Sequence, residues 1–329
     1  MIRFRNLRFR RRLSRYGFTL IELLVGMTIA GILAALTLPA VQSVRESSRK
    51  LQCHSRLRQV SLALSMHESQ KRFYPPGRMG CSSSVGQTPR WPQSPCAELN
   101  IPNRLCGASA LVPLLPYLEQ DSLFRDLDGR ATGLWVDNLN NTSWYVDATE
   151  AKQNAIRMRP GVFSCPSSPA QPLSQVYAQL TQAATADYAF CQGTLGPDSP
   201  ENTVKYDNDG MFVYGRTRKT TDILDGLSNT IFIGEVRLPD QWESSNIWTY
   251  GRIHSDTLRT TRNPINTPPG EGIIHNRRNG AFGSQHPGGA SFAFGDGRVQ
   301  FVSETIDQDV YNAAAAIRDG QGTKSLFKH

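Results

Sequence analysis

Three polar residues near the C-terminus are of the types that a hydrolytic site requires. Ser284 and His286 are separated by one residue, and Asp296 follows His286 after nine intervening residues. A hydrolase with a serine nucleophile needs a histidine that takes the serine proton and an acid that orients the histidine. However, Ser284 lies in no G-x-S-x-G elbow, and side chains two apart on a strand point the same way without meeting. We therefore expect structural roles, in which His286 bonds the backbone and Asp296 and Gly297 form a turn.

A second polar stretch, "YDNDG" at residues 206–210, offers oxygen ligands that suit calcium. The glutamate that closes an EF-hand loop is missing from it. A polar turn before a strand explains the same residues without an ion. We expect no metal and no cofactor, and Asp207 and Asp209 are the calcium candidates if an ion does bind.

The cysteines suggest disulfides. None of the six lies in a C-x-x-C pair, and their spacing fits no zinc pattern. A body outside the cytoplasm would favour disulfide formation. The sequence alone does not choose among the possible pairings of Cys53, Cys81, Cys96, Cys106, Cys165 and Cys191.

An apolar stretch near the N-terminus has the length of a membrane span. Residues 18–38 contain a single charged side chain, Glu22, and about 20 apolar residues cross a bilayer. Seven arginines precede Gly17 and account for most of the net charge of +8. By the positive-inside rule they hold this end in the cytoplasm and send the remainder across the membrane. The remainder is nearly neutral, which argues against nucleic acid as a partner.

Glu22 separates three interpretations of this stretch. A secretory signal peptide has a shorter apolar core, of about 7–15 residues. A plain signal anchor explains the length but not the carboxylate, and a charge at mid-membrane costs about 2.5–3.5 kcal/mol. In the third interpretation the acid has a purpose. Residues 15–24, "RYGFTLIELL", resemble the N-terminal signal of type IV pilins and type II secretion pseudopilins.

This resemblance implies how the N-terminus is processed. A membrane peptidase would cut between Gly17 and Phe18 and methylate Phe18, so that Glu22 becomes the fifth residue of the mature chain. Glu22 would then face the Phe18 ammonium of a neighbouring subunit, because a charge in low dielectric is costly until it is paired. Pro39 would take the place where this family often has a helix-kinking proline.

Beyond the span, the pattern predicts a long helix and then mostly strands. Apolar residues recur at helical spacing through residues 41–67, and the prolines of "FYPPG" at 73–77 end the helix. Residues 77–107 predict a cysteine-rich surface insertion. Further helices are expected at 116–124, 149–157 and 308–318, and strands at 161–165, 187–191, 211–214, 230–236, 247–252, 290–294 and 298–303.

The last two strands flank "GDG", a hairpin signal with Asp-Gly in the turn. With His286 upstream, this stretch resembles the C-terminal H-x9-DG element of a large bacterial family of prepilin-type proteins with a head of unknown function. "CHSRLRQVSLAL", "LLPYLEQDSLF", "FSCPSSP", "DYAFCQG" and "TDILDGLSNTIFIGE" resemble other blocks of that family. The family usually has Cys-Pro-Ser-Asp where this chain has "CPSS". Because Cys53 and Cys165 fall in such blocks, the resemblance implies that they pair.

Together these observations predict an α+β, pilin-like fold with an antiparallel sheet in the head. The expected parts are a leader (1–17), a transmembrane helix (18–40), a helix extension that packs on the head (41–72) and an extracytoplasmic head (73–329) with the hairpin at 286–303. We expect a non-enzymatic pseudopilin-like subunit of a type II secretion or pilus-like assembly in the bacterial inner membrane. Its partners would be prepilin peptidase, other pilin-like subunits and the bilayer. The alternative is a membrane-tethered binding module or hydrolase that uses the helix only as an anchor.

Overall fold

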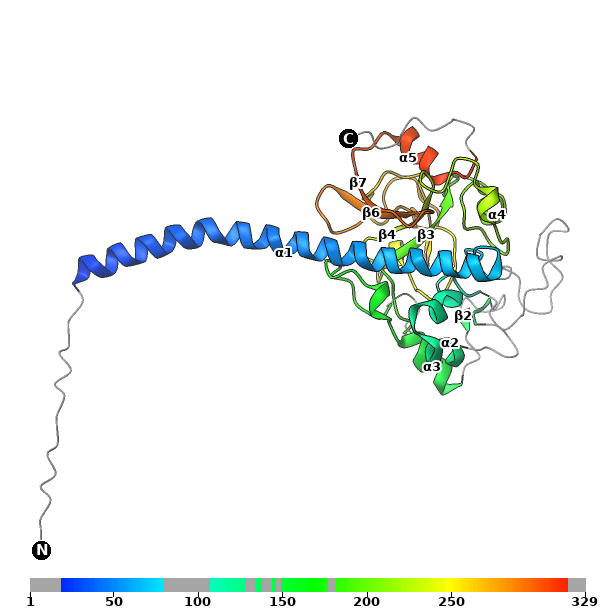
Figure 1. Cartoon of the computed structure of the whole chain (residues 1–329), viewed down its shortest axis with the longest axis horizontal. Coiled ribbons are helices and arrows are strands. Elements are labelled where there is room, and N and C mark those ends of the chain that lie inside the picture. The colour runs from blue at the N-terminus through cyan, green and yellow to red at the C-terminus, as the bar shows by residue number, and fades with distance from the viewer. Residues whose placement is uncertain are drawn as a thin grey trace, which may run out of the picture. The chain divides into compact units, whose positions relative to one another are not determined.

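The computed structural model describes residues 19–79, 107–127, 134–137, 144–145, 149–174, 176 and 182–318. Its first element is α1 (Leu20–Lys71), a helix of 52 residues that passes through Pro39 (Figure 1). At 1.5 Å per residue such a helix is about 78 Å long. The chain divides within α1 into a unit that ends at Ser47 and a unit that begins at Ser48.

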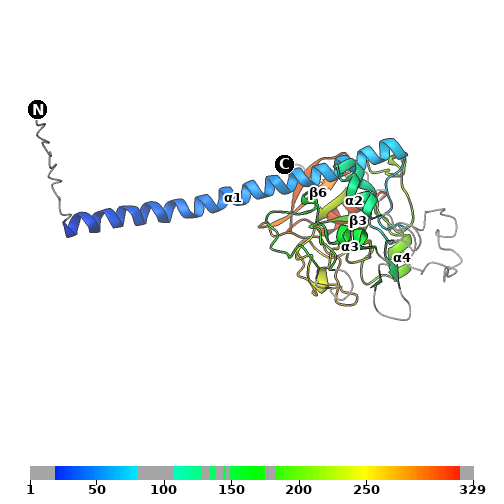
Figure 2. The same cartoon turned by 90° about the horizontal axis from the view of Figure 1, so that it is seen from below.

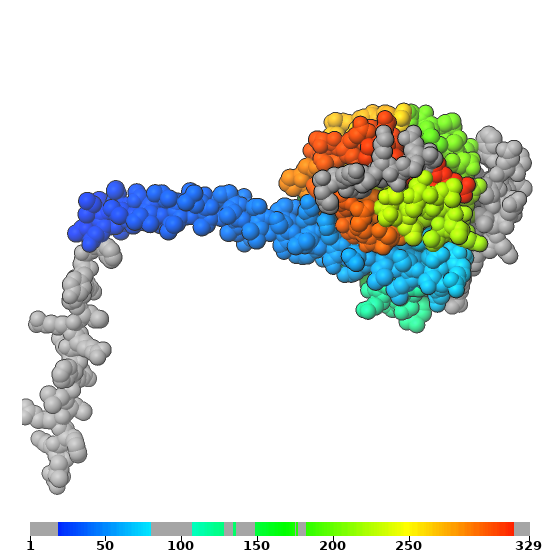
Figure 3. All heavy atoms as spheres, turned by 45° about the horizontal axis from the view of Figure 1, so that its top comes forward, coloured from blue at the N-terminus to red at the C-terminus, as the bar shows by residue number. Residues whose placement is uncertain are grey.

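The first unit is apolar and exposed. An 18-residue window within α1 has a mean hydropathy of 2.1 and none of it is buried, so by length and composition this helix can cross a membrane. In the space-filling view this segment is dark blue (Figure 3). Helical hydrogen bonds satisfy its backbone, which is the condition for a chain segment to enter lipid.

In the second unit, one face of α1 packs on the head. Cys53, Leu57, Val60, Leu64 and His67 are buried, and they recur every three or four residues, which places them on one side of a helix. The apolar members of this set join a core cluster with residues of η3 (Val112–Leu118). Figure 1 and Figure 2 both show this cyan half of α1 alongside the head.

The head is built around a mixed sheet in the order β5-β3-β4-β6-β7. Neighbouring strands are antiparallel except that β5 runs parallel to β3. The α+β prediction is confirmed, and the parallel edge is an addition to the expected antiparallel sheet. The strands are β3 (Tyr188–Gly193), β4 (Ile231–Glu235), β5 (Leu258–Thr260), β6 (Gly289–Phe294) and β7 (Val299–Ser303).

Alternate residues of the sheet enter two different cores, because successive strand side chains point to opposite faces. On β3, Tyr188 and Phe190 belong to the cluster that α1 completes. Ala189 and Cys191 belong to a second cluster, which includes Tyr311 of α5 (Gln308–Ala315). The central strands are therefore covered on both faces.

The remaining elements are short. Thr149 caps α3 by accepting the Lys152 backbone N–H at 3.4 Å. Asp307 caps α5 in the same way. The other elements are α2 (Asp121–Asp126), β1 (Val136–Asp137), β2 (Trp144–Tyr145), α3 (Glu150–Arg157), η4 (Gly161–Phe163), α4 (Glu201–Tyr206), η5 (Thr220–Asp222) and η6 (Trp242–Ser244).

Three predicted strands are wrong, and three strands were missed. Residues 161–165 form η4 and a turn, because the Phe163 and Ser164 N–H groups bond carbonyls three residues back. Residues 211–214 and 247–251 are buried, but these segments make only isolated bridges. The missed strands are β1, β2 and β5, whose two or three residues are too few for a period to be visible in the sequence.

Candidate functional site

The start of α1 places Glu22 beside Thr19. Glu22 Oε2 accepts the Thr19 backbone N–H at 2.9 Å and its hydroxyl at 2.7 Å, and the Glu22 N–H donates to Thr19 Oγ1 at 3.3 Å. This is a capping box, which satisfies donors that a helix N-terminus leaves open. The T-x-x-E spacing was the available signal, and sequence reasoning did not use it. Gly17 and Phe18 lie outside the described residues, as does the rest of the leader.

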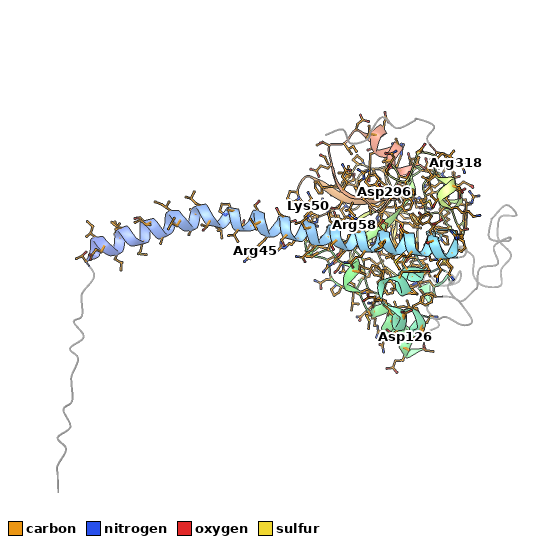
Figure 4. All side chains as sticks on the ribbon, viewed as in Figure 1. Arg45, Lys50, Arg58, Asp126, Asp296 and Arg318 are labelled. Atoms are coloured by element: carbon orange, nitrogen blue, oxygen red, sulfur yellow. A yellow bond between two sulfur atoms is a disulfide. The ribbon has the colours of Figure 1, made fainter. Side chains whose placement is uncertain are left out.

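The helix that follows Glu22 presents apolar side chains on all sides (Figure 4). Leu20, Met27 and Leu36 are each about two-thirds exposed or more. The Thr28 and Thr37 hydroxyls donate to the carbonyls of Val25 and Leu33 at 2.8 and 2.9 Å, so these groups are satisfied without water. Such a surface is suited to lipid or to the same surface of another helix.

A different cluster lies inside the head, where His286 meets a disulfide and a carboxylate. His286 Nε2 is 3.6 Å from Cys165 Sγ and 3.3 Å from Glu235 Oε1. Cys53, on α1, forms a disulfide with Cys165, with Cα atoms 5.1 Å apart. All four residues are buried. Sequence reasoning had named His286 and the two cysteines but missed Glu235, the last residue of β4.

Each residue of this cluster is positioned by a different segment. Cys53 comes from the buried face of α1, and Cys165 follows η4. Glu235 ends β4, and His286 precedes β6, the strand that pairs with β4. The fold thus brings together residues that are far apart in the chain, from four of the family-like blocks or their edges.

The disulfide is the pairing that the family-like blocks implied. Cys191, another disulfide candidate, is instead a buried free thiol on β3. Complete burial raises the pKa of this thiol to about 12, so it is inert at neutral pH. Cys81, Cys96 and Cys106 lie outside the described residues.

Two buried carboxylates lie at the cluster, and each is held by hydrogen bonds or an ion pair. Glu235 Oε2 accepts the Ser291 N–H at 2.7 Å. Asp187 accepts the Cys165 N–H at 2.6 Å and pairs with Arg159. Burial raises the pKa of Asp187, and the Arg159 charge opposes that rise. The chain thus holds two carboxylates, those of Asp187 and Glu235, in its buried interior around one disulfide.

A second histidine, His54, faces Ser291 of β6. Its Nε2 lies 3.0 Å from Ser291 Oγ. Burial lowers the pKa of His54, while the Glu235 charge acts in the opposite direction. His54 therefore favours its neutral form at neutral pH.

Asp296 and Gly297 form the turn that the sequence predicts. Asp296 Oδ1 accepts the Arg298 N–H at 2.9 Å, and Gly297 has φ +85°. Figure 4 labels Asp296 at this turn between β6 and β7. His286 precedes β6 and Asp296 follows it, so a strand about 20 Å long separates them. The Ser284 hydroxyl donates to the Gly289 carbonyl at 2.7 Å, and a serine–histidine–aspartate triad does not assemble here.

The two calcium candidates do not converge. Asp209 accepts the Thr194 N–H at 2.7 Å and the Thr194 hydroxyl at 2.5 Å, so both of its oxygens tie down a loop. Asp207 is exposed at the end of α4. Asp209 also lines a cavity of about 370 Å³, in which Arg216, Arg218 and Arg318 outnumber the acids. That surplus of positive charge opposes a cation.

Comparisons with known proteins find matches both for the N-terminal segment and for the rest of the chain. Residues 12–38 match the prokaryotic N-terminal methylation motif. The chain is 33% identical over 82 residues to the type II secretion system core protein G of Pseudomonas aeruginosa. That stretch is 25% of this chain and 58% of the relative, so the chain spans less than two-thirds of the relative's length. No solved structure matches the chain.

The remaining match covers most of the molecule. Residues 42–309 match the model of a protein family of unknown function, DUF1559. These residues include Cys53, Cys165, Glu235 and His286, and also the hairpin turn. The chain is therefore a member of the DUF1559 family that carries a prepilin-type methylation motif at its N-terminus.

Proposed function

We propose that this chain is a pseudopilin-like structural subunit of a type II secretion or pilus-like assembly. The observation that carries the proposal is the exposed apolar half of α1, with Glu22 as its single acid between residues 18 and 38. The methylation motif and the similarity to a type II secretion core protein support it. The structure of the head supplies no assembled catalytic triad in the described residues.

In this proposal a prepilin peptidase removes residues 1–17 and methylates Phe18. The arginine-rich leader stays in the cytoplasm before the cut, and the head lies outside the inner membrane. The mature helix remains in the bilayer and packs against the helices of other pilin-like subunits. No nucleic acid takes part.

The capping box defines how Glu22 serves both its own helix and a neighbour. Both Thr19 bonds end on Oε2, and we assign Oε1 to the Phe18 ammonium of the adjoining subunit. Pairing offsets the cost of holding a charge in lipid. It also favours one axial register between helices, because other registers leave both charges unpaired.

Two matched variants separate the charge of Glu22 from its capping role. Glu22→Gln keeps an oxygen that can accept the Thr19 bonds but removes the charge. Thr19→Val removes the hydroxyl of the cap and keeps the charge. We expect Glu22→Gln to be cut and methylated normally but to stay out of assemblies cross-linked in the membrane, while Thr19→Val is incorporated.

Mass spectrometry of the mature N-terminal peptide checks processing, and membrane cross-linking checks assembly. A terminus other than methylated Phe18 would remove the proposal. Normal incorporation of Glu22→Gln would contradict the assembly role of Glu22 and leave the helix with the role of a membrane anchor for the head.

A further inference from the structure

The buried cluster around the disulfide contains the ligand set of a zinc site. The sulfurs of Cys53 and Cys165, one nitrogen of His286 and one carboxylate oxygen of Glu235 all lie within 4.8 Å of one another. Zinc binds thiolate, imidazole and carboxylate in tetrahedral sites. Two thiolates with one histidine and one carboxylate complete such a site without water.

Two of the separations between the donors also agree with a tetrahedron. Zinc–ligand bonds of about 2.0–2.3 Å place a tetrahedral N···O pair about 3.3 Å apart and an N···S pair about 3.6 Å apart. His286 Nε2 lies 3.3 Å from Glu235 Oε1 and 3.6 Å from Cys165 Sγ. The two sulfurs must separate, to about 3.8 Å, when their bond is broken, and the remaining donor separations are all below 4.8 Å.

Glu235 is an independent indication that a cation belongs here. Its Oε1 is buried and makes no hydrogen bond, and His286 Nε2 approaches it to 3.3 Å, so a buried negative charge is left with one imidazole beside it. Its Oε2 is held by the Ser291 N–H at 2.7 Å, which fixes the direction in which Oε1 points. Hydrogen bonds of this kind orient ligands at metal sites.

We propose that reduction of the Cys53–Cys165 disulfide turns this cluster into a zinc(II) site. A dithiol reductant supplies two electrons and two protons, which break the S–S bond and leave two thiols, while the reductant itself becomes a disulfide. Zinc(II) then displaces both thiol protons to solvent and keeps its own oxidation state. The ligands are Cys53 Sγ, Cys165 Sγ, His286 Nε2 and Glu235 Oε1.

This exchange preserves the attachment of α1 to the sheet. The disulfide joins α1 to the segment after η4. Zinc joins the same two segments and adds the end of β4 and the loop before β6. α1 is then linked to the head in both oxidising and reducing environments, by the disulfide in the first and by zinc in the second. The zinc content of the protein therefore indicates to which environment it was exposed.

The primary test measures zinc in the full-length protein in detergent. Oxidised and phosphine-reduced samples are freed of reductant without air, incubated with zinc(II) alone, washed, and assayed by elemental mass spectrometry. We expect reduced wild type to retain one more zinc ion per chain than reduced Cys53→Ser/Cys165→Ser. Cys191→Ala, which removes a thiol outside the cluster, should retain as much as wild type.

The comparison between the variants excludes zinc held by other cysteines, because those cysteines are present in both. Equal zinc in reduced wild type and the double variant would overturn the proposal. Equal uptake at the cluster by oxidised wild type would overturn it too, since the disulfide sulfurs have no thiolate to offer.

A second measurement needs no variant and therefore no assumption that a variant folds. Reduced wild type is alkylated with and without zinc(II), and peptide mass spectrometry follows each cysteine. Zinc should slow the alkylation of Cys53 and Cys165 together, whereas Cys191 should be unaffected. The same rate at Cys53 and Cys165 with and without zinc would contradict the site.

Cobalt(II) reports the other two ligands. Reduced wild type should show thiolate-to-cobalt charge transfer and an intense tetrahedral ligand-field spectrum. Glu235→Gln and His286→Gln should each keep the charge-transfer band and change the ligand-field bands. Unchanged spectra in both variants would show that the metal does not touch these residues.

Discussion

Removing the disulfide should have the largest effect on stability of any single cross-link in the described head. The bond closes a loop with a sequence separation of 112 residues. The loop-entropy relation gives about 5 kcal/mol for a loop of this length, through restriction of the unfolded chain. Cys53→Ser/Cys165→Ser should lower the free energy of unfolding by about 3–5 kcal/mol, because measured values often fall below the entropic figure.

Urea unfolding of the oxidised, full-length protein in detergent measures this change. Trp248 is fully buried and Trp135 nearly so, so tryptophan fluorescence reports the opening of the head. A chelator keeps metal out of both samples, and Cys191→Ala controls for the loss of a buried sulfur. A decrease below about 1 kcal/mol in the double variant would refute the reasoning, because it lies well below the expected range of about 3–5 kcal/mol.

Three further predictions concern the head. Leu57→Ala should lower the free energy of unfolding by about 2–5 kcal/mol, because truncating this fully buried residue of α1 leaves a cavity. Urea denaturation measures the change. A loss below about 0.5 kcal/mol, which is typical of a surface substitution, would contradict the packing of α1 on the head. Gly297→Ala should lower the free energy of unfolding by about 1 kcal/mol in the same assay, because an alanine is strained at φ +85°. The cost stays small because the added Cβ would meet no atom closer than 4.0 Å. No measurable change would argue against the turn. Burial, reinforced by the His275 charge, lowers the pKa of His254 to about 3 from 6.5, so the unfolded chain binds a proton that the folded chain refuses. This contribution to stability is complete above pH 6.5 and is lost between pH 6.5 and about 3, at up to about 1.4 kcal/mol per pH unit. His254→Asn, which suits the local φ of +56°, should flatten the pH dependence of the urea midpoint over this window, and an unchanged slope would refute it.

Much of the fold followed from local patterns in the sequence. The apolar periodicity of α1 and the alternation on either side of Asp296-Gly297 are repeated over enough residues to reveal a period. β5, with three residues, is too short for that. The wrong strands at 211–214 and 247–252 are largely buried, and burial alone does not distinguish a strand from a packed loop. In 161–165 only Phe163 and Cys165 are buried, as part of a short 3-10 turn and its end.

The cluster around His286 was only partly predictable. The cysteines and His286 stand in recognisable blocks, but Glu235 ends a strand as an ordinary acid would. Its position depends on β4 pairing with β6, a long-range contact that no local pattern encodes. The capping box of Glu22 is a local T-x-x-E signal, but the apolar run that follows it predicts a membrane span, in which an acid is explained by charge pairing rather than by a cap.

The disulfide also determines how tension would travel through the molecule. Cys53 lies on α1, and Cys165 lies beside the sheet, held through its N–H by Asp187. A pull on the helix is therefore passed to the head by the S–S link together with the packed face of α1, and it does not have to travel along the main chain between the two cysteines, which are 112 residues apart. Insertions in that stretch can lengthen it without weakening the joint that bears the load.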